Sequence, residues 1–261
     1  MTVSQILADL RVKNPLVHCI TNYVAMNISA NVVLAAGASP AMIHTPEEAA
    51  DFAKIVGGLT VNIGTLSPLW FEGMKLAAIA ANEASVPWVL DPVAHFATPY
   101  RANAAQELLA LKPTILRGNA SEIMGLSGKR SEAKGVDATD PVEAAEVGAK
   151  KLAQTHNMVV VITGKTDFVT DGNRIARISG GSPVMPRITA MGCSLTCLMG
   201  GFAAVSPPME AAATALALFA EAGSKAETEA NGPGSFQSLF LDALHNTTPE
   251  MLAQSDRVAW Q

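Results

Sequence analysis

The sequence predicts an α/β fold in which helices cover both faces of a mostly parallel central sheet. Short strand-like runs alternate with helical segments from the N-terminus to Gly164. These runs are apolar throughout, which is typical of parallel strands that are buried on both faces. The composition agrees with this fold class, because 49% of the residues are hydrophobic but only 5% are aromatic, and small residues allow helices to pack closely on a sheet.

The bulk properties bound the domain organisation and exclude several classes of protein. The 261 residues contain no internal repeat or long linker, so we expect one domain over residues 1–261. A net charge of −5 without a basic stripe argues against a nucleic-acid surface. Three cysteines without CxxC spacing argue against a disulfide framework and a zinc site. With no signal-peptide pattern and no apolar run long enough to span a bilayer, we expect a cytoplasmic protein that binds no membrane.

Periodicity and capping signals predict the helices of the first half. Residues 2–12 carry one apolar stripe, and Thr45-Pro46 followed by two glutamates has the features of a helix start. The predicted helices are 2–12, 27–36, one that opens at Thr45-Pro46, one near 69–84, one that follows Thr98-Pro99, 120–126, and one capped by Asp140-Pro141.

The strands are predicted where short apolar runs end in polar or small residues. They are, in order, 15–20, 39–43, 59–63, 87–90, 113–116 and 158–162, with an exposed loop over 127–139. Beyond Gly164 the pattern changes, because Asp171-Gly172 within 168–178 is typical of a β-hairpin, which adds antiparallel strands at one edge of the sheet. A short strand over 184–188 is then expected, followed by helices only, over 193–205, 207–228 and 234–245.

The turn from Thr189 to Thr196 is the strongest candidate for the reaction site. Small residues between a strand and a helix leave several backbone N–H groups unpaired at the helix N-terminus, which forms an anion cradle. The same dipole favours the thiolate of Cys193 in the first turn of the helix. A tight turn with a small buried cysteine is the structural alternative.

Polar side chains stand at the ends of the other predicted strands. In open α/β sheets, ligands bind outside the carboxyl ends of the strands, so these residues are expected to converge on one edge. They are Asn22, Met42, Gly64, Thr65, Asp91, Arg117, Asn119, Glu122, Thr163 and Gly164.

Two carboxylates in this set would suit a magnesium ion. Mg²⁺ keeps most of its water and needs only one or two carboxylates together with phosphate oxygens, which Asp91 and Glu122 would supply. Glu122 is equally explained as the third helical position of a capping box that begins at Asn119, and Asp91 as a turn residue before Pro92. Arg117 ends an apolar strand, where a guanidinium requires a phosphate or a buried carboxylate.

Taken together, the motifs resemble the ribokinase-like superfamily and, within it, the hydroxyethylthiazole kinase family of thiamine salvage. The resemblance runs from about residue 15 to residue 245. It rests on Leu16-Val17-His18-x-Ile20-Thr21-Asn22, Gly37-Ala38-Ser39-Pro40-Ala41-Met42, Asn62-Ile63-Gly64-Thr65-Leu66, Leu90-Asp91-Pro92-Val93, Arg117-Gly118-Asn119-Ala120-Ser121-Glu122-Ile123, Thr163-Gly164, the turn at 189–193 and Gly232-Pro233-Gly234-Ser235-Phe236.

The resemblance implies a ribokinase-like three-layer sandwich that uses ATP and Mg²⁺ to phosphorylate the primary alcohol of 4-methyl-5-(2-hydroxyethyl)thiazole, and that assembles as a homotrimer. It also implies a role for each candidate residue. The implied roles are catalysis for Cys193 and Gly192, ATP binding for Arg117, Thr163, Gly164 and Asn119, substrate binding for Met42, Ala190, Asn22, Gly64 and Thr65, and metal binding for Asp91 and Glu122.

The turn departs from the pattern of the resemblance. Most ribokinase-like sugar kinases carry an aspartate base where Cys193 stands, and the family turn is usually Gly-x-Gly-Cys, whereas this chain has Ala190-Met191-Gly192-Cys193. If the first position requires a positive φ, alanine costs about 1 kcal/mol or more. A bulky Met191 would also narrow the site.

Three other functions compete with this hypothesis. One is a kinase for another small alcohol, such as a hydroxymethylpyrimidine. The second is a hydrolase or transferase with Cys193 as nucleophile and His18 as base, although His18 on an apolar strand is more typical of a core histidine. The third is a non-catalytic binder of a nucleotide or thiazole.

Overall fold

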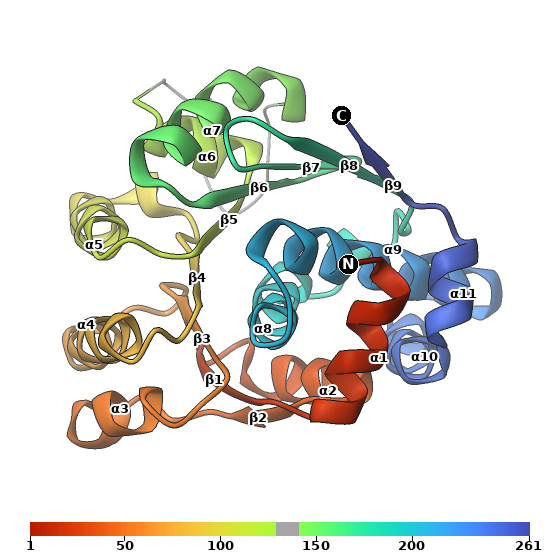
Figure 1. Cartoon of the computed structure of the whole chain (residues 1–261), viewed down its shortest axis with the longest axis horizontal. Helices are drawn as coiled ribbons and strands as arrows, with labels where there is room; N and C mark the ends of the chain where they lie inside the picture. The colour runs from red at the N-terminus through yellow and green to blue at the C-terminus, as the bar shows by residue number, and fades with distance from the viewer. Residues whose placement is uncertain (129–140) are drawn as a thin grey trace.

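A single nine-stranded sheet organises the part of the chain that the structure describes. The computed structural model describes residues 1–128 and 141–261. The strands follow the order β2-β1-β3-β4-β5-β6-β7-β8-β9 across the sheet (Figure 1). They are β1 (Leu16–Ile20), β2 (Ser39–Ala41), β3 (Gly58–Asn62), β4 (Trp88–Asp91), β5 (Ile115–Asn119), β6 (Val159–Thr163), β7 (Thr166–Thr170), β8 (Ile175–Ser179) and β9 (Val258–Trp260).

Helices form a layer on each side of this sheet, so the predicted three-layer α/β arrangement is confirmed (Figure 1). The helices are α1 (Val3–Lys13), α2 (Met26–Ala36), α3 (Pro46–Ala53), α4 (Pro68–Glu83), α5 (Pro99–Ala110), α6 (Ala120–Leu126), α7 (Val142–His156), α8 (Met191–Ala203), α9 (Pro208–Glu229), α10 (Pro233–Asn246) and α11 (Pro249–Gln254). Helices α3 to α7 cover one face, and α1, α2 and α8 to α11 cover the other.

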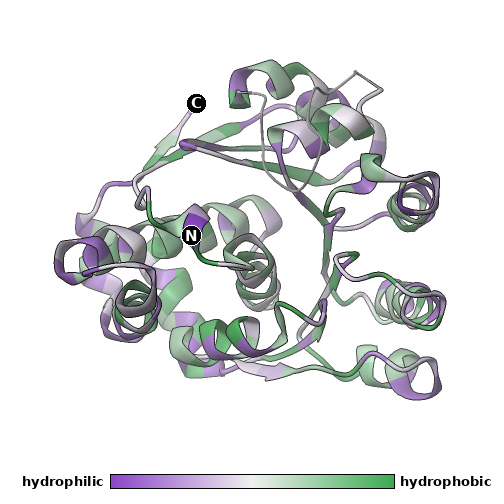
Figure 2. Ribbon diagram, turned by 180° about the vertical axis from the view of Figure 1, so that it is seen from behind, coloured by the Kyte–Doolittle hydropathy of each residue, from purple (hydrophilic) through white to green (hydrophobic). Residues whose placement is uncertain are grey.

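Each face of the sheet has its own hydrophobic core. Figure 2 shows hydrophobic residues gathered along the strands and on the helix surfaces that face them. One core joins α1, α2, α8, α9 and α10 to the sheet, and the other joins α3 to α7 to the opposite face. Because β1 to β6 are parallel, their carboxyl ends emerge at one common edge, where the loops between the layers meet.

Glycine lets α8 lie unusually close to the middle of the sheet. A Cβ atom at Gly200 would stand 2.4 Å from Cγ2 of Thr60 in β3, which is too close for any side chain. Helix α8 therefore packs directly on β1, β3 and β4, and its N-terminus reaches the edge at which those strands end. This packing positions the anion cradle that the sequence predicts.

Most predicted elements are confirmed to within two or three residues. The hairpin is confirmed as the antiparallel pair β7 and β8, whose turn places Gly172 at a φ of 96°. Predicted residues 129–139 of the loop, and Asp140 as a helix cap, lie outside the described part of the chain. No helix in the described ranges has the length and apolarity that crossing a membrane requires.

Two predictions for the last third are wrong. Residues 184–188 form no strand but contain a short 3₁₀ helix, η2 (Met185–Arg187), because Pro183 and Pro186 cannot donate the hydrogen bonds of a sheet. The C-terminal region is also not helical throughout. After α11 the chain returns to the sheet as β9, which pairs antiparallel with β8 and forms the outer edge beyond the hairpin.

Candidate active site

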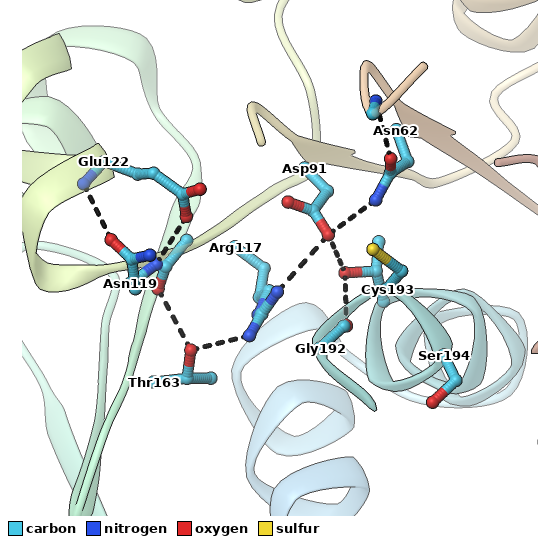
Figure 3. Close-up of polar contacts among 12 residues, drawn as sticks. Asn62, Asp91, Arg117, Asn119, Glu122, Thr163, Gly192, Cys193 and Ser194 are labelled. Atoms are coloured by element: carbon cyan, nitrogen blue, oxygen red, sulfur yellow. Dashed lines mark hydrogen bonds and ion pairs between the residues drawn. The ribbon is translucent and has the colours of Figure 1, made fainter. Parts of the chain in front are cut away.

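The candidate site lies where the carboxyl ends of β1, β3, β4, β5 and β6 meet the N-terminus of α8 (Figure 3). Five of the predicted residues, Asn22, Asp91, Arg117, Thr163 and Cys193, are joined there into one network of side-chain contacts, partly through Asn62. The convergence that strand topology predicts is therefore present in the folded chain.

Asp91, the last residue of β4, lies at the centre of the network. One of its carboxylate oxygens, Oδ2, accepts hydrogen bonds from Asn62 Nδ2 at 2.9 Å and Thr196 Oγ1 at 2.8 Å, and an ion pair from Arg117 at 3.3 Å. The other oxygen, Oδ1, is buried and has no hydrogen-bond partner in the described part of the chain. Burial raises the pKa of Asp91, against the opposing charge of Arg117. An orphaned carboxylate oxygen at this position is suited to a cation or a proton donor.

Arg117 connects Asp91 to the turn that begins after β6. Its guanidinium pairs with Asp91 and donates to Thr163 Oγ1 at 2.7 Å. A Cβ atom at Gly192 would stand 2.6 Å from both terminal nitrogens of the guanidinium, so only glycine lets the first turn of α8 approach this cation so closely. Burial works against the charge of Arg117, but Asp91 and Glu122 outweigh it and raise its pKa. The result is a fixed positive charge beside a helix N-terminus, which suits a phosphate.

Asn119 and Glu122 form the capping box that the sequence offered as an alternative. The Glu122 amide donates to Asn119 Oδ1 at 2.9 Å, and Glu122 Oε2 accepts from the Asn119 amide at 2.8 Å. The second oxygen, Oε1, accepts from the Ala94 amide at 2.9 Å. Burial, followed by the charge of Asp91, raises the pKa of Glu122 to about 7. Glu122 is thus both a helix cap and a buried carboxylate on the site edge.

Cys193 occupies the first turn of α8, as predicted, but its electrostatic setting differs from the expectation. Its Sγ accepts a long hydrogen bond from Asn22 Nδ2 at 3.4 Å. Burial and the neighbouring charge of Asp91 raise the pKa of Cys193 to about 12, although Arg117 and Asn22 act in the opposite direction. The thiol is therefore neutral at pH 7, and the prediction of a favoured thiolate is wrong for the protein without ligands.

The turn before α8 requires the left-handed backbone conformation. Ala190 caps the helix with a φ of 62°, a conformation that costs an L-residue about 1 kcal/mol relative to glycine. Met191 is 6% exposed and belongs to the core beneath α8. The expected narrowing of the site by Met191 is therefore not observed, because its side chain fills the core instead.

The other predicted residues lie around the network with different degrees of connection. Thr65 Oγ1 accepts from the Tyr23 amide next to Asn22, and the Gly64 amide donates to Asn62 Oδ1. The Gly164 amide donates to Asp167 Oδ1 at 2.9 Å. Met42 is half-buried against the core of α2 and α8, and among the residues that the structure describes no hydrogen bond joins it to the network.

His18 does not serve as a base for Cys193. It is fully buried, and its Nε2 donates to the Ile43 carbonyl at 2.8 Å while its ring packs edge-on against Phe52. Burial lowers the pKa of His18 to about 4. His18 is the core histidine that an apolar strand predicts, so a Cys193–His18 hydrolase has no geometric support.

Sequence reasoning missed two residues that organise the site. Asn62 at the end of β3 donates to Asp91 and accepts from Asn22, so it bridges two predicted residues. Thr196 in α8 donates to Asp91. A polar residue that ends an apolar strand was the available signal for Asn62. For Thr196 the signal was its position one helical turn after Gly192.

The donor set fits a magnesium ion that is also bound to phosphate, but not a metal held by protein alone. Within the described ranges, no three His, Cys, Asp or Glu side chains lie together in a way that could hold a metal ion. Asp91 Oδ1 nevertheless remains unpartnered, and Glu122 lies near enough to Asp91 for the charge of Asp91 to help raise the pKa of Glu122. One or two carboxylates are what Mg²⁺ requires when phosphates and waters complete its shell.

Comparisons with known proteins agree with this geometry. The sequence profile of the Hydroxyethylthiazole kinase family matches residues 7–250. A hydroxyethylthiazole kinase of Roseobacter denitrificans is 60% identical over 97% of this chain and 99% of its own length. The solved structure of a hydroxyethylthiazole kinase protein from Pyrococcus horikoshii superposes with a TM-score of 0.91 at 35% identity, over 99% of this chain and 98% of that chain. A pyridoxal kinase from Staphylococcus aureus in complex with ADP shares the fold at a TM-score of 0.62 and 17% identity, over 80% of this chain and 87% of that chain.

Proposed function

The chain belongs to the hydroxyethylthiazole kinase family, and on that basis we propose that it transfers the γ-phosphoryl group of ATP to the primary alcohol of 4-methyl-5-(2-hydroxyethyl)thiazole. The observation that carries the proposal is the meeting of Arg117, the N-terminus of α8 and the orphaned oxygen of Asp91 at one sheet edge. Positive charge for a transferring phosphoryl group and a buried carboxylate for a phosphate-bound metal ion then lie side by side.

In this proposal the first turn of α8 binds the transferring group. The amides of Met191, Gly192 and Cys193 precede the first intrahelical bond, which runs from the Ser194 amide to the Ala190 carbonyl, so their N–H groups face the edge. Arg117 adds a full charge beside them, and its bond to Thr163 extends the nucleotide side of the site to β6 and Gly164. Asn119 supports this side as the cap of α6.

We place the alcohol on the opposite side, between Asn22, Cys193 and Asp91. Met42, Gly64, Thr65 and Ala190 would then surround the thiazole ring. The neutral thiol of Cys193 orients the hydroxyl and is not an ionised base, so the hydroxyl proton passes to the transferred phosphoryl group as the new O–P bond forms. The reaction does not require a strong base, because phosphoryl transfer depends mainly on positioning and charge stabilisation and its transition state is loose.

Magnesium would be held by Asp91 and Glu122. When bound, it would neutralise charge on the phosphate oxygens. Asn62, Thr196 and Arg117 all engage Oδ2 of Asp91, which leaves Oδ1 free for the metal ion. The chain's own contribution is thus to orient Oδ1 of Asp91 and to bury it away from solvent.

The assembly and setting of the protein also follow the family resemblance. We propose a cytoplasmic homotrimer in which the whole chain forms one kinase domain, and the continuous sheet from β2 to β9 supports a single domain.

A substrate panel tests the proposed reaction. The purified protein is assayed for ADP release with the thiazole alcohol, a hydroxymethylpyrimidine and pyridoxal, with and without Mg²⁺, and the phosphorylated product is identified by mass. We expect the thiazole alcohol to give the highest kcat/KM and the rate to vanish without Mg²⁺. A clearly faster pyrimidine alcohol would overturn the substrate assignment. No ADP release with any alcohol would favour a non-catalytic binder.

The role of Asp91 is tested in the same assay. Asp91→Asn keeps the shape of the side chain but removes the charge, and we expect kcat to fall by about 10² or more, as with the loss of a group that stabilises charge in the transition state. Lys75→Gln, on the exposed surface of α4, serves as the control. Activity of Asp91→Asn within about twofold of the wild type would exclude the proposed role.

A further inference from the structure

Arg101 carries a second guanidinium near the site, and none of the reaction steps above uses it. It lies in the first turn of α5, half-buried, behind the loops that follow β3 and β4. Its side chain donates to four backbone carbonyls. They are those of Ala94 at 3.1 Å, Gly64 at 2.7 Å, Ile63 at 2.7 Å and Val93.

This arrangement requires arginine. Four of the five guanidinium N–H groups are used, and the planar fork reaches two loops at once, whereas a lysine ammonium has three donors at one point. Arg101 forms no salt bridge with a carboxylate in the described ranges, so all the hydrogen bonds of its side chain given above go to peptide carbonyls, and the charge of Glu122 acts on it only from a distance. The two loops it joins carry the residues that follow Asn62 and Asp91.

Each of these loops is connected by hydrogen bonds to a carboxylate of the site. The Ala94 peptide accepts from Arg101 through its carbonyl, and the Ala94 amide donates to Glu122 Oε1 at 2.9 Å. The Gly64 carbonyl also accepts from Arg101, and the Gly64 amide donates to Asn62 Oδ1 at 2.9 Å. Asn62 in turn donates to Asp91. Both carboxylates are thus held by short chains of hydrogen bonds that begin at one guanidinium.

The strained backbone at Ala94 also indicates that Arg101 holds this loop in place. Ala94 has a φ of 46°, which is unfavourable for an alanine. Such a conformation persists only where its surroundings enforce it. Here the Ala94 carbonyl accepts from Arg101 and from the Ala97 amide, and the Ala94 amide donates to Glu122. We propose that Arg101 is a positioning residue for phosphoryl transfer, which fixes the separation of Asp91 and Glu122 by clamping the loops 63–64 and 93–94. This inference rests on the proposed function.

Substitution of Arg101 is compared with substitution of a matched arginine far from the site. Arg11 is also half-buried and also donates to backbone carbonyls, those of Ala36, Leu244 and His245. Arg101→Lys and Arg11→Lys therefore remove similar bonds and keep the charge. We expect kcat of Arg101→Lys to fall about 10- to 100-fold, since small misplacements of reacting groups cost rates of this size, while Arg11→Lys stays within about twofold.

The KM for ATP distinguishes a loss of positioning of Asp91 and Glu122 from a general disruption of the folded site. Arg117 and Thr163 lie on β5 and β6, and none of the four Arg101 side-chain hydrogen bonds given above goes to these strands, so the KM for ATP is expected to change by less than about threefold in Arg101→Lys. If kcat of Arg101→Lys stays within about twofold of the wild type, or if both lysine variants lose kcat equally, the inference is overturned.

Hydrogen exchange tests the clamp without reference to catalysis. In the wild type without ligands, the amides of Gly64 and Ala94 should exchange at least about tenfold more slowly than in an unstructured peptide, although both lie in loops. We expect this protection to be lost in Arg101→Lys and kept in Arg11→Lys. Exchange of the wild-type amides at the rate of an unstructured peptide overturns the inference even if Arg101→Lys does not fold. A wild type that phosphorylates no alcohol but retains the protection overturns the proposed function instead.

Discussion

At the scale of single residues, burial outweighs local signals in this site. The sequence places Cys193 at a helix N-terminus, which favours a thiolate, yet burial and the charge of Asp91 raise its pKa to about 12. A helix terminus carries only about half a charge, and its effect is confined to the first turn. Removing a thiolate from water costs more than that partial charge returns. The chemistry of Cys193 is therefore that of a neutral, oriented thiol.

Cys193→Asp is expected to keep or raise kcat. An aspartate beside Arg117 and the N-terminus of α8 would be ionised more readily than the thiol and would accept the proton of the alcohol. Steady-state kinetics with the thiazole alcohol measure the effect, and Cys197→Ser, one turn further along α8, controls for changes in the helix. Complete loss of activity in a folded Cys193→Asp variant would instead indicate a thiol nucleophile.

At the scale of elements, α8 combines the features that the site requires. Its N-terminus supplies the anion cradle, Gly192 admits Arg117, and Gly200 brings the helix onto β3. Thr196 on the same helix holds Asp91. The helix achieves this although its cap residue, Ala190, is in a strained conformation. Strain that is retained at a functional turn is common where the surrounding structure enforces it.

Ala190→Gly is expected to relieve this strain. Glycine adopts a φ of 62° without steric cost, so the variant should gain up to about 1 kcal/mol of unfolding free energy, or roughly 2–4 °C in Tm for a chain of this size. Ala25→Gly is the matched control, because Ala25 caps α2 without a side-chain bond but at a φ of −95°. The control should be destabilised. If Ala190→Gly is no more stable than the wild type, the backbone conformation of Ala190 does not lower the unfolding free energy.

At the scale of the whole molecule, the two cores bury titratable groups whose effects on stability oppose each other. Burial raises the pKa of Glu122 to about 7 and lowers that of His18 to about 4. The folded chain holds the proton of Glu122 more tightly than the unfolded chain, so this contribution is present at low pH and is lost as the pH rises through 7. His18 contributes above its unfolded pKa, and that contribution is lost as the pH falls through 4.

Glu122→Gln should therefore change the pH dependence of stability. From pH 5 to pH 7, the unfolding free energy of the wild type without ligands should fall relative to that of Glu122→Gln by on the order of 2 kcal/mol. Urea unfolding at several pH values measures this difference. Glu47→Gln, an exposed glutamate in the first turn of α3, is the control. If Glu122→Gln and the wild type show the same slope, Glu122 does not hold its proton in the folded state.

Much of the fold was predictable because its signals are local. Apolar runs, proline at helix starts and Asp171-Gly172 each act within a few residues, and the corresponding elements formed as predicted. The failures arose where local signals compete or are absent. Pro186 stopped an apolar run from becoming a strand, and the three residues of β9 are too few to carry a pattern. Their pairing with β8 depends on the rest of the sheet.

The sequence alone determined the fold class, the edge of the sheet where the candidate site lies and many of the residues that gather there, because parallel strands bring their carboxyl ends together wherever they form. It also carried the family resemblance. Only the tertiary structure decided the state of those residues. The free oxygen of Asp91, the neutral thiol of Cys193 and the clamp of Arg101 depend on burial and on contacts between residues far apart in the chain. Desolvation and hydrogen-bond partners are properties of the packed molecule, and no local pattern encodes them.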